Sequence, residues 1–119
     1  MAQVIRFIPL VMGIVAALVG LGAVFFPEKS SAGFGVKVLA ENSVYVRTTG
    51  IRDVFIGLIF LYLFQSGDTK GLCLASLATA LVSFADFFIT LKFGNSKAWA
   101  VHLAATVFLI GYAVCLHAQ

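Results

Sequence analysis

Four ionisable side chains lie within long apolar stretches of the chain, namely Arg52, Asp53, Asp86 and His102. A charge at membrane depth costs a few kcal/mol on insertion scales and usually faces the interior of a helix bundle or water. An arginine fork could hold an anionic or carbonyl oxygen. Asp86, set among phenylalanines, and His102 could exchange protons with a bound molecule. We therefore take these four residues as the candidate catalytic groups.

Further polar side chains accompany them at helical spacing. Tyr45 and Thr49 lie on the same helical face as Arg52, and Ser83 lies three residues before Asp86. The predicted ligand-binding residues are Arg47, Tyr45, Thr49 and Ser83. The two cysteines show neither a CxxC motif nor a Cys/His spacing typical of a metal site, so no metal is predicted. No cofactor is predicted either.

The elements that must position these residues are membrane helices. The chain has 119 residues, of which 61% are hydrophobic and 11% are charged. In an average soluble domain about 45–50% of the residues are apolar and about 25% are charged. Apolar stretches of nearly 20 residues predict an all-α fold, an integral membrane antiparallel four-helix bundle. A single domain over 1–119 is expected, with helices at about 4–26, 44–65, 71–93 and 98–117. The small net charge of +3, carried by scattered basic residues, argues against a nucleic-acid partner.

The segment 27–42 is the longest connection. Its middle, Phe34 to Leu39, mixes apolar residues with a lysine, and is expected to be a short interfacial helix, a lid or a plain surface loop. The end of the bundle that holds this long loop carries four basic residues, Lys29, Lys37, Lys92 and Lys97. The end that holds the termini carries two, Arg6 and Lys70. The positive-inside rule therefore predicts a cytoplasmic long loop, external termini and a location in the plasma or inner membrane.

The chemically active residues are expected to meet in one leaflet. At a rise of 1.5 Å per residue, Arg52 and Asp86 lie roughly 10 Å below the long-loop surface and His102 roughly 6 Å below it. Arg52 is then predicted to reach Asp86. Asp53 is predicted to pair with Arg47 or to accept a hydrogen bond from His102.

Several functions remain open from these residues. The favoured one is a small membrane protein that binds or acts on a small lipophilic molecule by acid–base chemistry; whether it is an enzyme is left open. The alternatives are charges that merely clamp the helices, a proton-coupled small transporter, or an accessory subunit of a larger membrane complex. The expected partners are the lipid bilayer, a lipophilic ligand and a second copy of the chain. A stripe of Gly13, Ala17 and Gly20 could serve such a homo-oligomer or the monomer core.

A set of short motifs carries a family resemblance. They are FFP at 25–27, AGFG at 32–35, R-x-x-G-I-R-D-x-x-x-G from Arg47 to Gly57, Asp86, and a histidine early in the last helix. In these features the chain resembles, over nearly its whole length, a family of small four-helix membrane proteins of bacteria and fungi that is known as a domain of unknown function. The resemblance implies the helix number and draws attention to Arg47, Arg52, Asp53 and Asp86. It implies no activity.

Overall fold

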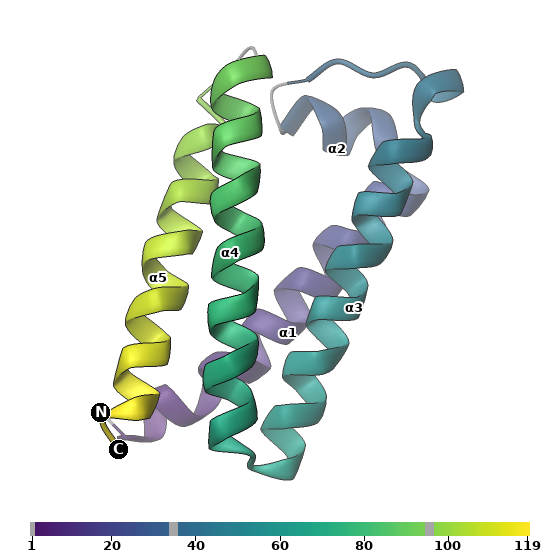
Figure 1. The fold of residues 1–119 in the computed structure, drawn as a ribbon. Helices are drawn as coiled ribbons and strands as arrows, with labels where there is room; N and C mark the ends of the chain where they lie inside the picture. Colours follow the sequence, from purple (N-terminus) through teal and green to yellow (C-terminus); the bar gives the residue numbers. More distant parts are fainter. Residues whose placement is uncertain (1, 34–35, 95–96) are drawn as a thin grey trace.

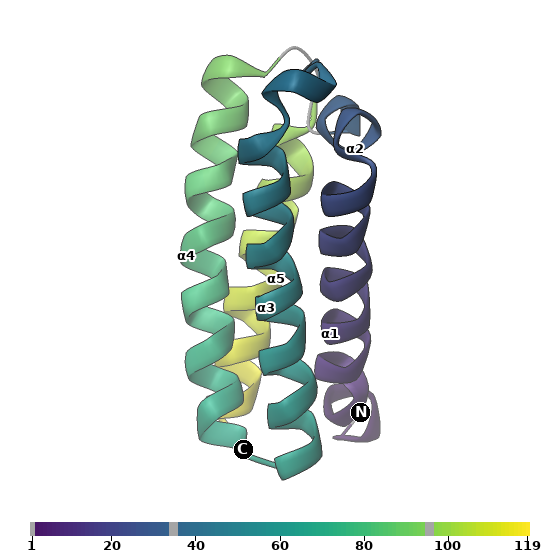
Figure 2. The same cartoon turned by 90° about the vertical axis from the view of Figure 1, so that its right-hand side faces the viewer.

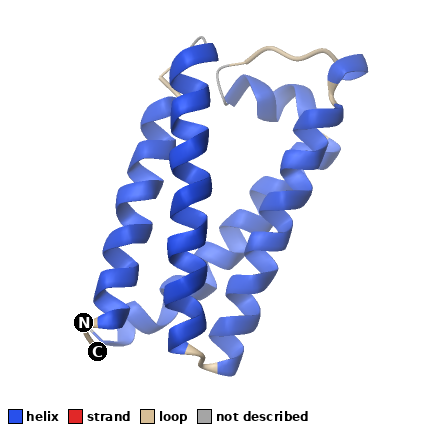
Figure 3. Ribbon diagram, viewed as in Figure 1, coloured by secondary structure: helices blue, strands red, loops and turns tan. Residues whose placement is uncertain are grey.

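The computed structural model describes residues 2–33, 36–94 and 97–119 and is helical almost throughout. The α-helices are α1 (Ala2–Phe25), α2 (Pro27–Gly33), α3 (Val44–Ser66), α4 (Thr69–Phe93) and α5 (Trp99–His117), with a 3-10 turn at Ala40–Asn42. The described residues contain no strand (Figure 3). The predicted all-α class is therefore confirmed.

The predicted number of helices was wrong, because the described residues form five α-helices and not four. The additional helix, α2, occupies the first half of the long connection. The predicted interfacial segment included Phe34 and Gly35, which lie outside the described residues, and its remainder, 36–39, is not helical. α2 forms where it does because Pro27 has a helical φ already fixed at the first position. Glu28 then complements the positive end of the helix dipole.

The four long helices form two antiparallel pairs. α1 packs along α3, and α4 packs along α5, whereas the two pairs make far fewer contacts with each other. In Figure 1 the pairs converge at the end that holds both termini and diverge toward α2. Figure 2, turned by 90°, shows α1 and α3 running side by side.

Glycines let the backbones of α1 and α3 come close together. A Cβ atom added at Gly57 would lie 2.6 Å from the carbonyl oxygen of Gly13, and one added at Gly50 would lie 2.6 Å from that of Gly20. Such close approach through small residues is typical of helix packing in lipid, where van der Waals contact replaces the hydrophobic effect. Gly13 and Gly20 of the small-residue stripe are thus buried within one copy of the chain, and Ala17 is partly buried.

The apolar core lies at the end where the pairs converge. Its buried members are Phe60, Leu63, Leu72, Ala80, Leu109, Tyr112 and Leu116. The Tyr112 hydroxyl also donates a hydrogen bond of 3.4 Å to the carbonyl oxygen of Ile5, which ties α5 to α1. The polar residues singled out from the sequence lie in the other half of the molecule, where the pairs stand apart.

Three helices of the described chain, α1, α4 and α5, are long and apolar enough to cross a membrane. α3 is not among them, although it runs along α1. Large apolar side chains such as Leu74, Leu81 and Val107 are exposed on the outer surface, which suits contact with lipid tails. These helices indicate an integral membrane protein.

Candidate functional site

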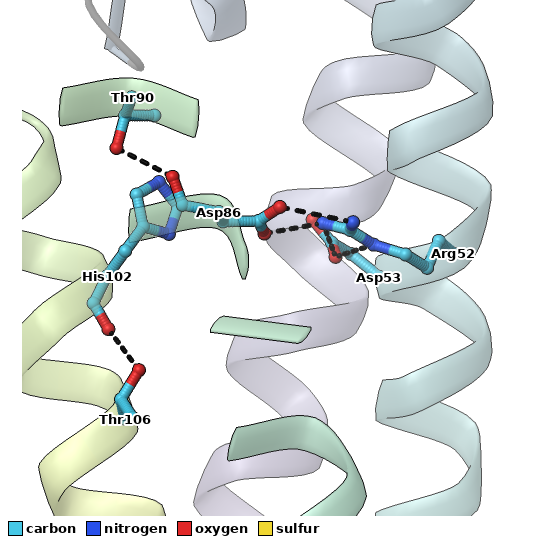
Figure 4. A network of polar contacts seen from close by, with 6 residues as sticks. All are labelled: Arg52, Asp53, Asp86, Thr90, His102 and Thr106. Atoms are coloured by element: carbon cyan, nitrogen blue, oxygen red, sulfur yellow. Dashed lines mark hydrogen bonds and ion pairs between the residues drawn. The ribbon is translucent and has the colours of Figure 1, made fainter. Parts of the chain in front are cut away.

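An ion pair between Arg52 and Asp86 joins the two helix pairs. The Arg52 Nη2 atom lies 2.9 Å from Asp86 Oδ2, and Nη1 lies 3.4 Å from Oδ1 (Figure 4). The guanidinium therefore meets the carboxylate through two nitrogens, with one short contact and one longer contact. It connects α3 to α4 across 34 residues of sequence, and the predicted contact between these two residues is therefore confirmed.

Asp53 is a second carboxylate on the same guanidinium. Arg52 reaches it through Nε and Nη2, both 3.4 Å from the same oxygen, Oδ1. The predicted pairing of Asp53 with Arg47 was wrong. Arg47 instead donates to the carbonyl oxygen of Val24 at 2.7 Å and to Ser43 Oγ at 3.1 Å. The last carbonyl groups of a helix lack partners within it, so the end of α1 attracts this arginine.

The ion pair is half-buried rather than sealed in a packed core. The exposed fraction of the side chain is 37% for Arg52, 18% for Asp53 and 22% for Asp86. The polar atoms of the site are therefore accessible to a small molecule.

Two hydroxyl groups near the site serve the backbone. Thr90 Oγ1 donates to the carbonyl oxygen of Asp86 at 2.7 Å, and Thr106 Oγ1 donates to that of His102 at 2.8 Å (Figure 4). Such bonds to the residue four positions earlier are common for threonine in helices. Both hydroxyl protons are thus used by backbone carbonyl groups.

Two cavities of about 310 Å³ each flank the ion pair. The first lies toward α2 and is lined from α2, the segment after it, α3, α4 and α5. The second lies among α1, α3, α4 and α5, and its lining is mostly aliphatic and aromatic. Both volumes fall at the lower end of the range for small-molecule sites, about 300–1,000 Å³.

Arg52, Asp86 and His102 line both cavities, and we call these three residues the polar wall. Of the other candidates, Tyr45 and Thr49 line the first cavity, and Asp53 and Ser83 line the second. Arg47 is not among the residues that line either one. The structure thus gathers seven of the eight candidates around two cavities that share the polar wall, and it sets Arg47 apart.

Sequence reasoning missed the apolar lining. Met12, Val15 and Val19 of α1 line the second cavity, and Val36 and Val38 line the first. No signal distinguishes them, because an apolar residue that faces a cavity looks like one that faces lipid. In the described part of the chain, no three histidine, cysteine, aspartate or glutamate side chains gather to hold a metal ion.

Comparison with known proteins identifies the family alone. A family model described as a domain of unknown function, DUF4267, matches residues 13–116. Searches of curated proteins and of solved structures each found no match. The predicted resemblance to an uncharacterised family is confirmed, whereas the role of residues 50–53 as its hallmark stays a prediction. Since the match spans most of the chain, this protein belongs to the DUF4267 family.

Proposed function

We propose that this protein binds a small lipophilic molecule within the membrane and exchanges protons with that molecule's polar group. One observation carries the proposal: Arg52, Asp86 and His102 line two cavities at once. A molecule in either cavity would therefore meet the same three polar side chains.

The lining supports a ligand with one polar and one apolar part. Small-molecule sites are mostly apolar, with a few placed polar groups that set orientation. The second cavity combines the polar wall with side chains such as Met12, Val15 and Phe108. A hydrocarbon portion would pack on these residues, and its polar end would face the wall.

Two groups of the wall are suited to move a proton. A carboxylate and an imidazole are common general acids and bases. In the proposed site, Arg52 fixes the orientation of Asp86 through its two-pronged contact, and His102 faces the same space from α5. Arg52 is thus a positioning residue, and Asp86 and His102 are the proton-transfer groups.

A purely structural clamp makes different demands. A clamp requires matched charges, because each unpaired charge in an apolar medium is costly. Here the pair borders open space on both sides, and a histidine shares that space. These features favour a binding site over a clamp.

Native mass spectrometry of the protein purified in mild detergent tests the proposal. We expect wild type to carry a small molecule distinct from bulk lipid, and His102→Ala to lose it while remaining folded. His117→Ala is the matched control, because His117 lies exposed at the far end of the same helix. For Asp86→Asn the control is Asp68→Asn, since Asp68 caps the start of α4 and asparagine caps equally well.

A different result would favour the clamp. If wild type carries bulk lipid alone, the Arg52–Asp86 ion pair serves helix packing and not ligand binding. Once a ligand is known, turnover in detergent would indicate an enzyme. Movement that requires a sealed vesicle would indicate a transporter.

A further inference from the structure

We propose that the ligand of the second cavity is an amphiphile with a positively charged head, of the alkylamine class. Its head would meet Asp53, and its chain would lie between α1 and α5. The inference rests on the proposed function and adds the chemical class of the ligand and its orientation.

The first argument is charge balance. The Arg52 guanidinium contacts two carboxylates, those of Asp53 and Asp86. One positive and two negative charges leave a formal charge of −1 at the cavity wall. Among the described residues lining the second cavity, no lysine and no second arginine offsets it, and His102 is the one further group able to carry a positive charge. A cationic head would neutralise this excess.

The second argument is how the guanidinium is used. Asp86 occupies both terminal nitrogens of Arg52, with its shorter contact at 2.9 Å. An anionic head would compete with both carboxylates for the guanidinium and would add to the negative charge of the site. Asp53, by contrast, receives only two 3.4 Å contacts, both at Oδ1. A cation can therefore approach Asp53 without breaking the link between α3 and α4.

The third argument is position. Asp53 lines the second cavity and is not among the residues that line the first. Met12 and Val19 on α1 and Phe108 on α5 border the same space and offer apolar surface to an alkyl chain. Val101, with 68% of its surface exposed, stands at the rim. The chain of the amphiphile can therefore continue past this rim into the lipid.

Three probes with the same twelve-carbon chain test the head group: dodecyltrimethylammonium, dodecanol and dodecyl phosphate. The full chain is reconstituted in phosphatidylcholine nanodiscs, and the apparent Kd is taken from the rise of Tm with probe content. We expect dodecyltrimethylammonium to raise Tm most. Asp53→Asn should weaken its binding by about tenfold to a hundredfold, which corresponds to a lost contact with a charged group. Asp68→Asn should leave the Kd unchanged.

A rim substitution tests the path of the alkyl chain. Val101→Trp narrows the second cavity. Val107→Trp is its control, because Val107 is about as exposed (65%, against 68% for Val101) and does not line this cavity. We expect only Val101→Trp to weaken binding of dodecyltrimethylammonium. Circular dichroism of each variant confirms that the helices have formed.

The outcomes separate this inference from the proposed function. If dodecanol or dodecyl phosphate binds best, and Val101→Trp still weakens it, the cavity is a ligand site but the cationic class is overturned. Retention of ammonium binding by Asp53→Asn overturns it equally. If no probe binding responds to Val101→Trp, this inference is overturned, because the second cavity then holds none of the probes. A co-purifying ligand whose binding still depends on His102 would place the proposed function in the first cavity instead.

Discussion

The Arg52 guanidinium contacts two carboxylates unequally, and the two aspartates therefore contribute differently to stability and to the charge of the site. Asp86 receives two prongs, the shorter at 2.9 Å, and comes from another helix. Asp53 is the next residue in the chain and is contacted at one oxygen, 3.4 Å away. Asp86 therefore links α4 to α3, whereas Asp53 mainly adds negative charge to the site.

Asp86→Asn should consequently destabilise the protein more than Asp53→Asn. Losing one partner of a charge-assisted hydrogen bond costs about 1–3 kcal/mol, and the partial exposure of Arg52 places the loss at the lower end. For Asp53→Asn we expect less than about 1 kcal/mol. Unfolding by denaturing detergent in micelles measures both variants.

The double variant Arg52→Leu with Asp86→Leu supplies the control for that comparison. Replacing both members of an ion pair by apolar residues is often neutral or stabilising. It should therefore recover most of the stability lost in Asp86→Asn. Equal losses for the two single aspartate variants would contradict the unequal roles assigned here.

At the scale of the elements, the pair α1 and α3 depends on glycine. Gly13 faces Gly57, and Gly20 faces Gly50, so closely that a methyl group added at Gly50 or Gly57 would lie 2.6 Å from a facing carbonyl oxygen, well inside van der Waals contact. The close contact of these two backbones fixes the position of Arg52 and Asp53 on one side of the site.

Gly57→Ala should disrupt this contact. Its new Cβ would lie 2.6 Å from the Gly13 oxygen and 2.7 Å from the Ala17 nitrogen, and neither backbone atom can move aside cheaply. Overpacking of this kind costs about 1–3 kcal/mol. Gly111→Ala is the matched control, since nothing lies within 4 Å of its added Cβ. This variant should be as stable as wild type or more stable by about 0.5–1 kcal/mol, because alanine favours the helix over glycine. An equal loss in both variants, measured by detergent unfolding, would argue against close packing at Gly57.

The sequence allowed α1, α4 and α5 to be predicted because a bilayer demands about 20 apolar residues in a row. The alternating direction of those helices also placed Arg52, Asp86 and His102 near one end. α2 escaped prediction because Pro27–Gly33 is too short and too polar to show a helical period. The role of Arg47 escaped as well, since an acceptor at Val24 is a backbone carbonyl, which every residue possesses.

At the scale of the whole molecule, packing is concentrated at one end and polar contact at the other. The buried core lies where the termini meet. Toward α2, the Arg52–Asp86 ion pair is a direct charged link between the pair α1/α3 and the pair α4/α5. The spacing of the two pairs at that end should therefore depend on this contact.

Spin labels can measure that spacing. Double electron–electron resonance measures the distance between two spin labels. Labels at Tyr45 and Lys92 give the distance between the helix pairs at the α2 end, and labels at Gln65 and His117 give it at the other end. Cys73 and Cys115 are replaced by alanine beforehand, because both are free thiols. With Arg52→Leu and Asp86→Leu, we expect the Tyr45–Lys92 distances to broaden and the Gln65–His117 distances to stay narrow. Broadening at both ends would show a general loosening, and no change at either end would show that the ion pair does not set the spacing.

The 34-residue separation between Arg52 and Asp86 has a consequence for biosynthesis. A ribosome completes α3, with its arginine, well before it has made the aspartate on α4 that takes both prongs of the guanidinium. Until then, only the neighbouring Asp53 offsets the cost of placing that arginine in lipid. Entry of α3 and α4 into the bilayer together, as a helical hairpin joined by the turn at 67–68, avoids this cost. We therefore expect α3, which is less apolar than the three candidate membrane spans, to enter the bilayer together with α4 and not alone.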